Sequence, residues 1–234
     1  MTKWRINKFV AQCLGISRRK AEGLIKSGHV KMNKQTIYDL SFRVQPNTSS
    51  ITVHGEVLSP RTYTYYALNK PLGYTSTRHD PFAVKKVVDL VPSFPAVYPA
   101  GRLDKNSEGL IVLTNDGEIT QKITSPADHL EKEYYVEATV VRSNWDIRQL
   151  KKLLKGVNID GYTTKPSKVF AWRHTGKSVS FYIILEEGKK RQIRRMAQKI
   201  GLEIKTLRRV RIGKLKLGNL KPGEYRKIRT EDIL

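Results

Sequence analysis

The stretch from Gly101 to Gly117, with the sequence GRLDKNSEGLIVLTNDG, places the strongest constraint on how this chain can fold. Four apolar residues in a row, Leu110 to Leu113, are bounded on both sides by polar turns that contain glycine. A short, unbroken apolar run between turn signals predicts a strand that is buried on both faces. We therefore expect a central strand here, preceded by a polar turn that carries Arg102 and Asp104.

Asp104 can be interpreted in two ways from this stretch alone. An aspartate in a turn commonly accepts hydrogen bonds from the nearby backbone. A carboxylate mounted directly ahead of a rigid strand is also restricted in direction, as a reacting group needs to be. Partners elsewhere in the chain have to distinguish a structural aspartate from a catalytic one.

The charge of the chain indicates a polyanionic partner. Its 234 residues include 44 Lys and Arg against 21 Asp and Glu, which gives a net charge of +23. Such a field attracts nucleic acid. An anionic membrane is the alternative, but no apolar run reaches the roughly 18 residues that a membrane-spanning helix needs, and the sequence has no lipidation motif.

Signals for export, disulfides and metal binding are also missing from the sequence. The N-terminal residues MTKWRINKFVAQCLG lack the continuous apolar segment of a signal peptide. The single cysteine, Cys13, excludes an intrachain disulfide, and the five histidines do not have the spacing of metal ligands. We expect a cytoplasmic, monomeric protein with no metal and no membrane contact.

The first 60 residues predict a compact α+β module. Residues 3–14 carry apolar side chains at helical spacing. Ser17 is a good N-cap for a second helix, which stops at Gly28. Short strands are expected at residues 29–32 and 51–53.

Three cations, Arg18, Arg19 and Lys20, occupy the first turn of the second expected helix. The helix dipole is positive at this end, so cations are disfavoured there by about 0.3–1 kcal/mol each. Either this turn is a solvated basic surface, or a phosphate of RNA binds to both the helix terminus and the side chains. We favour the second interpretation and add Arg5 and Lys8 as candidate RNA contacts.

The remainder of the chain predicts a larger α+β domain. Residues 55–61, GEVLSPR, are typical of a linker, so we expect domains at residues 1–59 and 60–234. Most of the expected strands are joined by short turns, which predicts a mainly antiparallel sheet flanked by helices. The expected elements are strands at 63–68, 110–113 and 133–140, a hairpin of 168–172 and 178–185, one or two strands within 203–217, and helices at 84–90, 143–154 and after Gly188.

The stretch from Lys189 to Lys216 has a high density of positive charge, with 12 Lys and Arg against one acid, Glu203. Its position on an expected helix and strand suggests a basic wall. Such a wall would bind the backbone of a nucleic acid. A solvated surface is the alternative, but it does not account for so large an excess of charge.

The N-terminal module resembles the S4 RNA-binding domain over residues 3–58. The similarity lies in RINKFVAQCLGISRRKAEGLIKSGHVKMNKQTI, with its leading helix, its Gly-x-Ser-Arg-Arg helix start and its Gly-x-Val-x-x-Asn strand and turn. The resemblance implies binding to structured RNA and implies nothing about catalysis.

Four segments of the second domain, taken in order, resemble the pseudouridine synthases of the branch that has an N-terminal S4 domain and modifies ribosomal RNA. The element G-R-L-D-x-x-[ST]-x-G-L is a specific signature, and the resemblance spans essentially the whole chain. Ser107 stands where the family often has threonine, a departure that keeps the hydroxyl group. The four segments read NKPLGYT, GRLDKNSEGLIVLTNDG, KEYYV and EGKKRQIRRMAQKIGLEIKTL.

The resemblance implies roles for individual residues. Asp104 would be the catalytic aspartate, Tyr134 the tyrosine beside the target base, and Arg194 the arginine that pairs with the aspartate. Arg102 would help to hold the target nucleotide out of its stack. The other implied substrate contacts are Ile193, Lys132 and Arg191, and the implied RNA contacts of this domain are Lys189, Lys190 and Arg195.

Two reservations apply to these assignments. Tyr135 directly follows Tyr134, although the spacing from Lys132 in K-x-Y favours Tyr134. Taken singly, Tyr134 is also explained as an ordinary strand residue, and Arg194 as part of a solvated helix face. The order and spacing of the whole set favour the active-site interpretation.

The chemistry of the reaction suits these residue types. Cleavage of the N-glycosidic bond of uridine leaves positive charge at C1′, which a carboxylate can stabilise, attack or relieve by removing a ribose proton. An arginine partner would keep Asp104 ionised. The detached base would need flat and apolar walls while it turns, which Tyr134 and Ile193 would supply. No redox change or phosphoryl transfer occurs, so we expect no cofactor.

Two alternatives remain open from the sequence. One is a pseudouridine synthase that acts on transfer RNA rather than ribosomal RNA or a pre-ribosomal particle. The other is a non-catalytic RNA-binding protein of ribosome assembly that has kept the fold.

Overall fold

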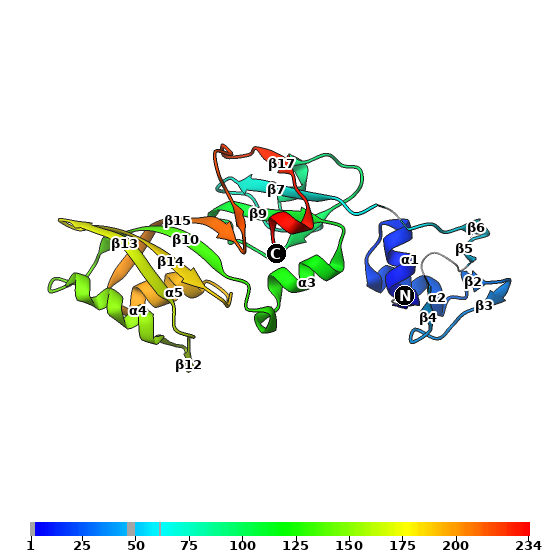
Figure 1. Cartoon of the computed structure of the whole chain (residues 1–234), viewed down its shortest axis with the longest axis horizontal. Coiled ribbons are helices and arrows are strands. Elements are labelled where there is room, and N and C mark those ends of the chain that lie inside the picture. The colour runs from blue at the N-terminus through cyan, green and yellow to red at the C-terminus, as the bar shows by residue number, and fades with distance from the viewer. Residues whose placement is uncertain (1–2, 46–49, 61) are drawn as a thin grey trace. The chain divides into compact units, whose positions relative to one another are not determined.

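The computed structural model describes residues 3–45, 50–60 and 62–234 and consists of two compact units, residues 1–63 and 64–234 (Figure 1). The division falls between residues 63 and 64, a few residues after the expected boundary. Part of the expected linker is a strand, β6 (Glu56–Val57), which pairs with β5 (Ile51–Val53) inside the first unit. The last residue of that expected linker, at position 61, lies outside the described residues.

The first unit is an α+β module built on two short helices. Helix α1 (Ile6–Leu14) ends at Gly15, which adopts the left-handed conformation (φ 68°), and α2 (Arg18–Lys26) begins after Ser17. The Ser17 hydroxyl accepts a hydrogen bond from the Lys20 N–H, so the expected N-cap is confirmed. The strands are β1 (Trp4–Arg5), β2 (Val30–Met32), β3 (Gln35–Thr36), β4 (Arg43–Val44), β5 and β6.

The second unit contains a nine-stranded sheet in which neighbouring strands are mostly antiparallel, as the sequence predicts. Strands β15 and β9 pair in parallel at the middle of the sheet. The main strand order is β13-β14-β10-β15-β9-β7-β17, and β16 and β8 pair with β15 and β9. The bounds are β7 (Tyr65–Lys70), β8 (Tyr98–Ala100), β9 (Glu108–Thr114), β10 (Lys132–Val140), β13 (Lys168–Thr175), β14 (Ser178–Leu185), β15 (Leu202–Ile212), β16 (Leu215–Lys216) and β17 (Tyr225–Lys227).

The helices of the second unit are shorter than the sequence predicts. The expected helix at 143–154 is a 3-10 turn (Ile147–Leu150) followed by α4 (Lys151–Lys155). The helical stretch begins only after Asp146, which is its N-cap and accepts a hydrogen bond from the Arg148 N–H. The expected helix at 84–90 is a 3-10 turn over Val87–Leu90. The other elements are α3 (Gly117–Thr124), α5 (Gln192–Lys199), the hairpin β11 (Asn158–Ile159) and β12 (Tyr162–Thr163), and 3-10 turns at Pro126–Asp128 and Thr230–Asp232.

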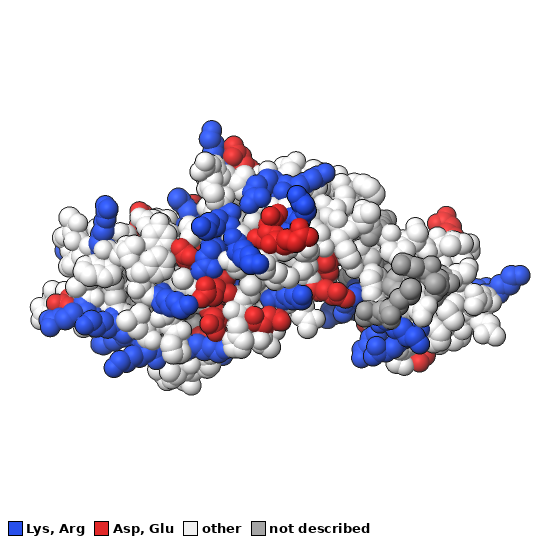
Figure 2. Space-filling view, in the orientation of Figure 1, with Lys and Arg blue, Asp and Glu red and all other residues white. Residues whose placement is uncertain are grey.

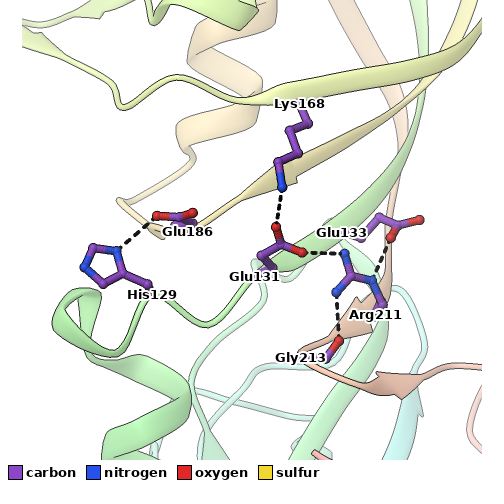
Figure 3. A network of polar contacts seen from close by, with 7 residues as sticks. All are labelled: His129, Glu131, Glu133, Lys168, Glu186, Arg211 and Gly213. Atoms are coloured by element: carbon purple, nitrogen blue, oxygen red, sulfur yellow. Dashed lines mark hydrogen bonds and ion pairs between the residues drawn. The ribbon is translucent and has the colours of Figure 1, made fainter. Parts of the chain in front are cut away.

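The two faces of the β10–β15 part of the sheet differ in character. Its inner face carries buried side chains such as Val136 and Leu207, which pack with the α5 residues Ile193 and Met196. Its outer face is polar and is crossed by ion pairs (Figure 3). There Arg211 contacts both Glu131 and Glu133, and Glu131 also contacts Lys168. None of the helices within the described ranges is long and apolar enough to cross a membrane.

Gly109 allows β15 to lie directly beside the strand that follows Asp104. Its φ is 100°, and a Cβ atom at this position would collide with the Arg209 carbonyl oxygen. Only glycine combines this backbone conformation with such a close approach. The expected central strand, Leu110 to Leu113, is fully buried within β9.

We predict that Gly109→Ala destabilises the protein by at least about 2 kcal/mol, because both backbone strain and a clash with β15 would result. Gly161→Ala is the matched control: Gly161 also has a positive φ, 79°, but a Cβ atom there would meet none of the described residues within 4 Å. The measurement is the free energy of unfolding in urea. Equal losses for the two variants would show that the close approach of β15 contributes nothing.

Candidate active site

The turn that carries Asp104 is fixed through its backbone. Every carbonyl oxygen from Leu103 to Ser107 accepts a hydrogen bond. Leu103 O accepts from the Ser76 hydroxyl, Asp104 O from the Ser107 N–H, and Lys105 O from the Gly73 N–H. Asn106 O accepts from Arg194, and Ser107 O accepts from Lys70. Residues far away in the sequence therefore set the conformation of this turn.

Lys70, at the end of β7, is the most deeply buried of these partners. Its side chain is fully buried, and its ammonium group donates to Ser107 O at 2.6 Å and to Pro71 O at 3.0 Å. Burial lowers the pKa of Lys70 to about 8, while the nearby carboxylates of Asp104 and Glu108 act in the opposite direction. Lys70 thus holds the turn and places a positive charge behind the Asp104 carboxylate.

Arg194, on α5, binds the same turn. It was expected to pair directly with the Asp104 carboxylate, and in the structure it binds other groups of the turn instead. Its guanidinium donates to Asn106 O at 2.5 Å and to the Ser107 hydroxyl at 3.3 Å. Among the described residues, no hydrogen bond or ion pair joins it to the Asp104 carboxylate, and its other terminal nitrogen donates to Ile204 O at 3.3 Å. The two charges still interact at longer range: burial lowers the pKa of Arg194, and Asp104 raises it.

A cavity of about 350 Å³ opens beside this turn. This volume lies at the lower end of the range of about 300–1,000 Å³ for ligand pockets. Asp104, Tyr134 and Ile193 all line the cavity, although they are far apart in the sequence. Arg102 and Arg191, two expected substrate contacts, line it as well. The sequence-predicted set therefore converges, apart from Arg194 and Lys132.

Tyr134 and Ile193 form the flat and apolar parts of the cavity wall. Tyr134 points to the inner face of β10, where it lies opposite Ile183 of β14 and Arg209 of β15. Tyr135 points to the outer face and donates to Glu137, whereas Tyr134 lines the cavity. Ile193 is the second residue of α5, and Leu207 of β15 completes this side.

Lys132 is buried beneath the site rather than placed on the cavity wall. It lies two residues before Tyr134 on the same face of β10, and burial lowers its pKa to about 8, with a further contribution from Arg209. Arg209 is also buried and donates to Leu110 O at 2.7 Å. These two cations, with Lys70, place buried positive charge behind the site.

A second carboxylate, Glu187, lines the cavity, but its hydrogen bonds give it a structural role. It accepts hydrogen bonds from the Tyr162 hydroxyl, the Lys165 N–H and the Gln192 side chain. Gln192 in turn accepts from the Lys189 N–H. Glu187 therefore fixes the loop at 188–191, and both of its oxygens are occupied by these donors.

The expected basic wall at 189–216 is only partly formed. Lys189, Lys190 and Arg191 line the cavity, although the Lys189 ammonium lies 3.2 Å from the centre of the Tyr162 ring. Several of the later cations are paired with acids or buried, whereas Lys199, Lys214 and Lys216 are exposed. Arg195 contacts Asp160, Arg208 contacts Glu108 and Arg211 contacts Glu131 and Glu133. Figure 2 shows this interspersion of basic and acidic side chains over the second unit.

The candidate RNA contacts of the first unit lie on its surface. Arg18, Arg19 and Lys20 are exposed on the first turn of α2, next to the Ser17 cap. Arg5 is exposed in β1, and the Lys8 ammonium lies over the Trp4 ring at 4.3 Å. Across the described residues of both units, no group of three or more His, Cys, Asp or Glu side chains could hold a metal ion.

Comparison with known proteins identifies the family. A family model for RNA pseudouridylate synthase matches residues 64–199, and a model for the S4 domain matches residues 4–49. The chain belongs to the RNA pseudouridine synthases. It is 36% identical to an uncharacterized RNA pseudouridine synthase of Aquifex aeolicus, covering 100% of this chain and 93% of the relative.

Other relatives agree with this family over the full length. An uncharacterized RNA pseudouridine synthase of Bacillus subtilis, YtzG, is 35% identical and is covered to 96%, against 98% of this chain. A crystal structure of a pseudouridylate synthase aligns with a TM-score of 0.66 and 27% identity over 97% of both chains. The protein is therefore an RNA-modifying isomerase with an S4 domain and a pseudouridine synthase domain.

The sequence does not reveal several residues that shape the site of this pseudouridine synthase. Lys70 stands in the motif NKPLGYT, from which only a turn is predicted. A lysine at the inner end of a strand, followed by proline, is a signal that a buried ammonium could satisfy nearby carbonyls. Ser76, Glu187 and Arg209 act through neighbours that only the fold brings close.

We predict that Lys70→Met destabilises the synthase by about 2 kcal/mol or more, since the carbonyls of Pro71 and Ser107 would lose their buried donor. Isomerisation should fall at least tenfold as the Asp104 turn loosens. Lys105→Met, a change at an exposed lysine of the same turn, is the stability control and should cost less than about 0.5 kcal/mol. Wild-type unfolding and turnover in Lys70→Met would contradict this role.

Proposed function

We propose that this pseudouridine synthase isomerises one specific uridine of ribosomal RNA and that Asp104 performs the chemistry. The observation that carries the proposal is the Asp104 carboxylate itself, which lines the cavity together with Tyr134 and Ile193. Its backbone is held on every side, while its side chain is left open to the cavity. A carboxylate placed in this way is suited to contact a substrate rather than to maintain a turn.

In the proposed reaction the target uridine leaves its stack and its base enters the cavity. The glycosidic bond from C1′ to N1 breaks, the base takes the bonding electrons, and Asp104 stabilises or attacks the electron-deficient C1′. The base then turns while it is stacked on Tyr134 and bounded by Ile193. C5 bonds to C1′, and the proton of C5 is lost as N1 gains one. Atoms and charge balance without a cofactor or a metal.

Positive charge around the site would assist both stages. Lys70 and Arg194 donate to the backbone of the Asp104 turn and bring positive charge close to its carboxylate. Arg102, which is exposed and lines the cavity, would help to hold the flipped nucleotide out of its stack. Lys189, Lys190 and Arg191 would contact the neighbouring phosphates.

Ribosomal RNA is the proposed substrate because the chain has an S4 domain, which matches residues 4–49. The basic first turn of α2 gives this domain a surface for the phosphates of folded RNA. A transfer RNA substrate would need the same catalytic chemistry, so the two kinds of substrate are distinguished by the RNA that is modified in cells.

Pseudouridine mapping of total RNA from cells with and without the protein tests the proposal. We expect one ribosomal RNA uridine to lose its modification, to regain it with the wild-type chain, and to remain unmodified with Asp104→Asn. Asp128→Asn, the same change at an exposed aspartate outside the cavity, should restore modification fully. Restoration by Asp104→Asn would overturn the catalytic role, and loss confined to transfer RNA would overturn the substrate.

The S4 domain gives a separate prediction about binding. Replacing Arg18, Arg19 and Lys20 with Glu should weaken RNA binding. It should also make the slope of log affinity against log salt concentration shallower, by the contribution of up to about three phosphate contacts. The loss should be smaller for a minimal stem-loop that reaches only the second unit. The measurement is a salt titration of affinity by filter binding, and an unchanged slope would show that these cations are ordinary surface charge.

A further inference from the structure

The loop at residues 76–86, here called the Phe82 loop, presents two apolar side chains to solvent, and its base is joined to the candidate active site. Phe82 and Val84 are each 93% exposed, the highest values among the large apolar residues of the described chain. A single exposed apolar residue needs no explanation. Two of them at the tip of one loop indicate a contact surface when the loop is also ordered and suitably placed.

The tip of the Phe82 loop is a hydrogen-bonded turn. The Asp80 carboxylate accepts from the Phe82 N–H at 2.9 Å, and Asp80 O accepts from the Ala83 N–H. The base of the loop is closed by Thr75, which bonds to Lys85 O and to the Val87 N–H. The two apolar side chains are therefore held outward by a built turn.

The base of the loop is attached directly to the Asp104 turn. The buried Ser76 hydroxyl donates to Leu103 O at 2.9 Å and accepts from the Leu103 N–H at 3.1 Å. Leu103 precedes Asp104 and lines the cavity. The base of the loop and the wall of the cavity are therefore joined through Leu103.

The charges of the loop favour RNA as that object. Arg78 and Lys85 flank the two apolar residues, and Asp80 is occupied with the turn. Lys85 also lies 5.8 Å from the centre of the Tyr74 ring, and Lys86 pairs with Asp89 at the loop base. A basic loop with apolar side chains at its tip matches a polyanion whose interior is a stack of flat apolar rings.

We propose that the Phe82 loop is a wedge that enters the base stack of the RNA beside the target uridine. This inference rests on the proposed function and concerns a different step. Removing a uridine from its stack leaves a gap, and an apolar side chain that fills the gap makes the extruded state more populated. Phe82 supplies a ring for the exposed neighbouring base, and Val84 supplies a second apolar contact.

The test compares two RNA hairpins that contain the uridine found by mapping. In one the uridine is stacked in its natural context, and in the other it lies in a two-nucleotide bulge that is already unstacked. We expect the double variant Phe82→Ala and Val84→Ala to slow single-turnover isomerisation about tenfold on the stacked hairpin, within the range expected for one base–aromatic stack. On the bulged hairpin the rate should change less than about twofold, because no unstacking step remains for the wedge to assist.

Controls keep this outcome separate from misfolding and from failure of the proposed function. Phe94→Ala removes another exposed aromatic ring, 74% exposed and outside the loop, and should leave both rates unchanged. Phe82→Trp keeps a stacking ring and should restore the rate. A wild-type protein inactive on both hairpins would refute the proposed function instead. An unchanged rate for the double variant, an equal loss on both hairpins, or a change only in self-association would overturn the wedge.

Discussion

The structure of the site depends on one constraint: the five carbonyl oxygens of the Asp104 turn, from Leu103 to Ser107, are all bound by hydrogen-bond donors. Two of those donors are cations, Lys70 from the end of β7 and Arg194 from α5. A hydrogen bond from a charged donor is roughly twice as strong as a neutral one. The turn is consequently specified by the tertiary fold, and the Asp104 side chain has no structural task among the described residues.

The middle of the sheet positions the strand that follows this turn. Strands β15 and β9 meet in parallel at Gly109, where a side chain would collide with the Arg209 backbone. Because of that close approach, β15 alone separates β10, which carries Tyr134, from the strand that follows Asp104. The buried cations Lys70, Lys132 and Arg209 lie behind this junction, so the site combines an open carboxylate with a positive surrounding.

Much of this arrangement could be predicted from local sequence signals, and the limits of the prediction have a physical origin. The strand at Leu110 to Leu113 and the cap at Ser17 followed from periodicity and capping. That Asp104 and Tyr134 belong to one site was implied by the family resemblance. The expected direct pair between Asp104 and Arg194 is absent. Differences of a few ångströms decide whether the arginine meets the carboxylate or a nearby backbone carbonyl, and local sequence signals do not define positions that finely. The expected basic wall at 189–216 is only partly formed for a similar reason, since Arg195, Arg208 and Arg211 meet acids from distant parts of the sequence.

The central claim is that the cavity holds an extruded uridine with its C1′ facing Asp104. A crystal structure of the protein with the mapped RNA hairpin, carrying 5-fluorouridine at the target position, tests this claim most directly. Fluorine replaces the proton that must leave C5, so the base should be retained in the site. We predict a base that is stacked on Tyr134 and bounded by Ile193, with its ribose against Asp104. A target base that remains in the RNA stack, or one bound away from this cavity, would contradict the claim.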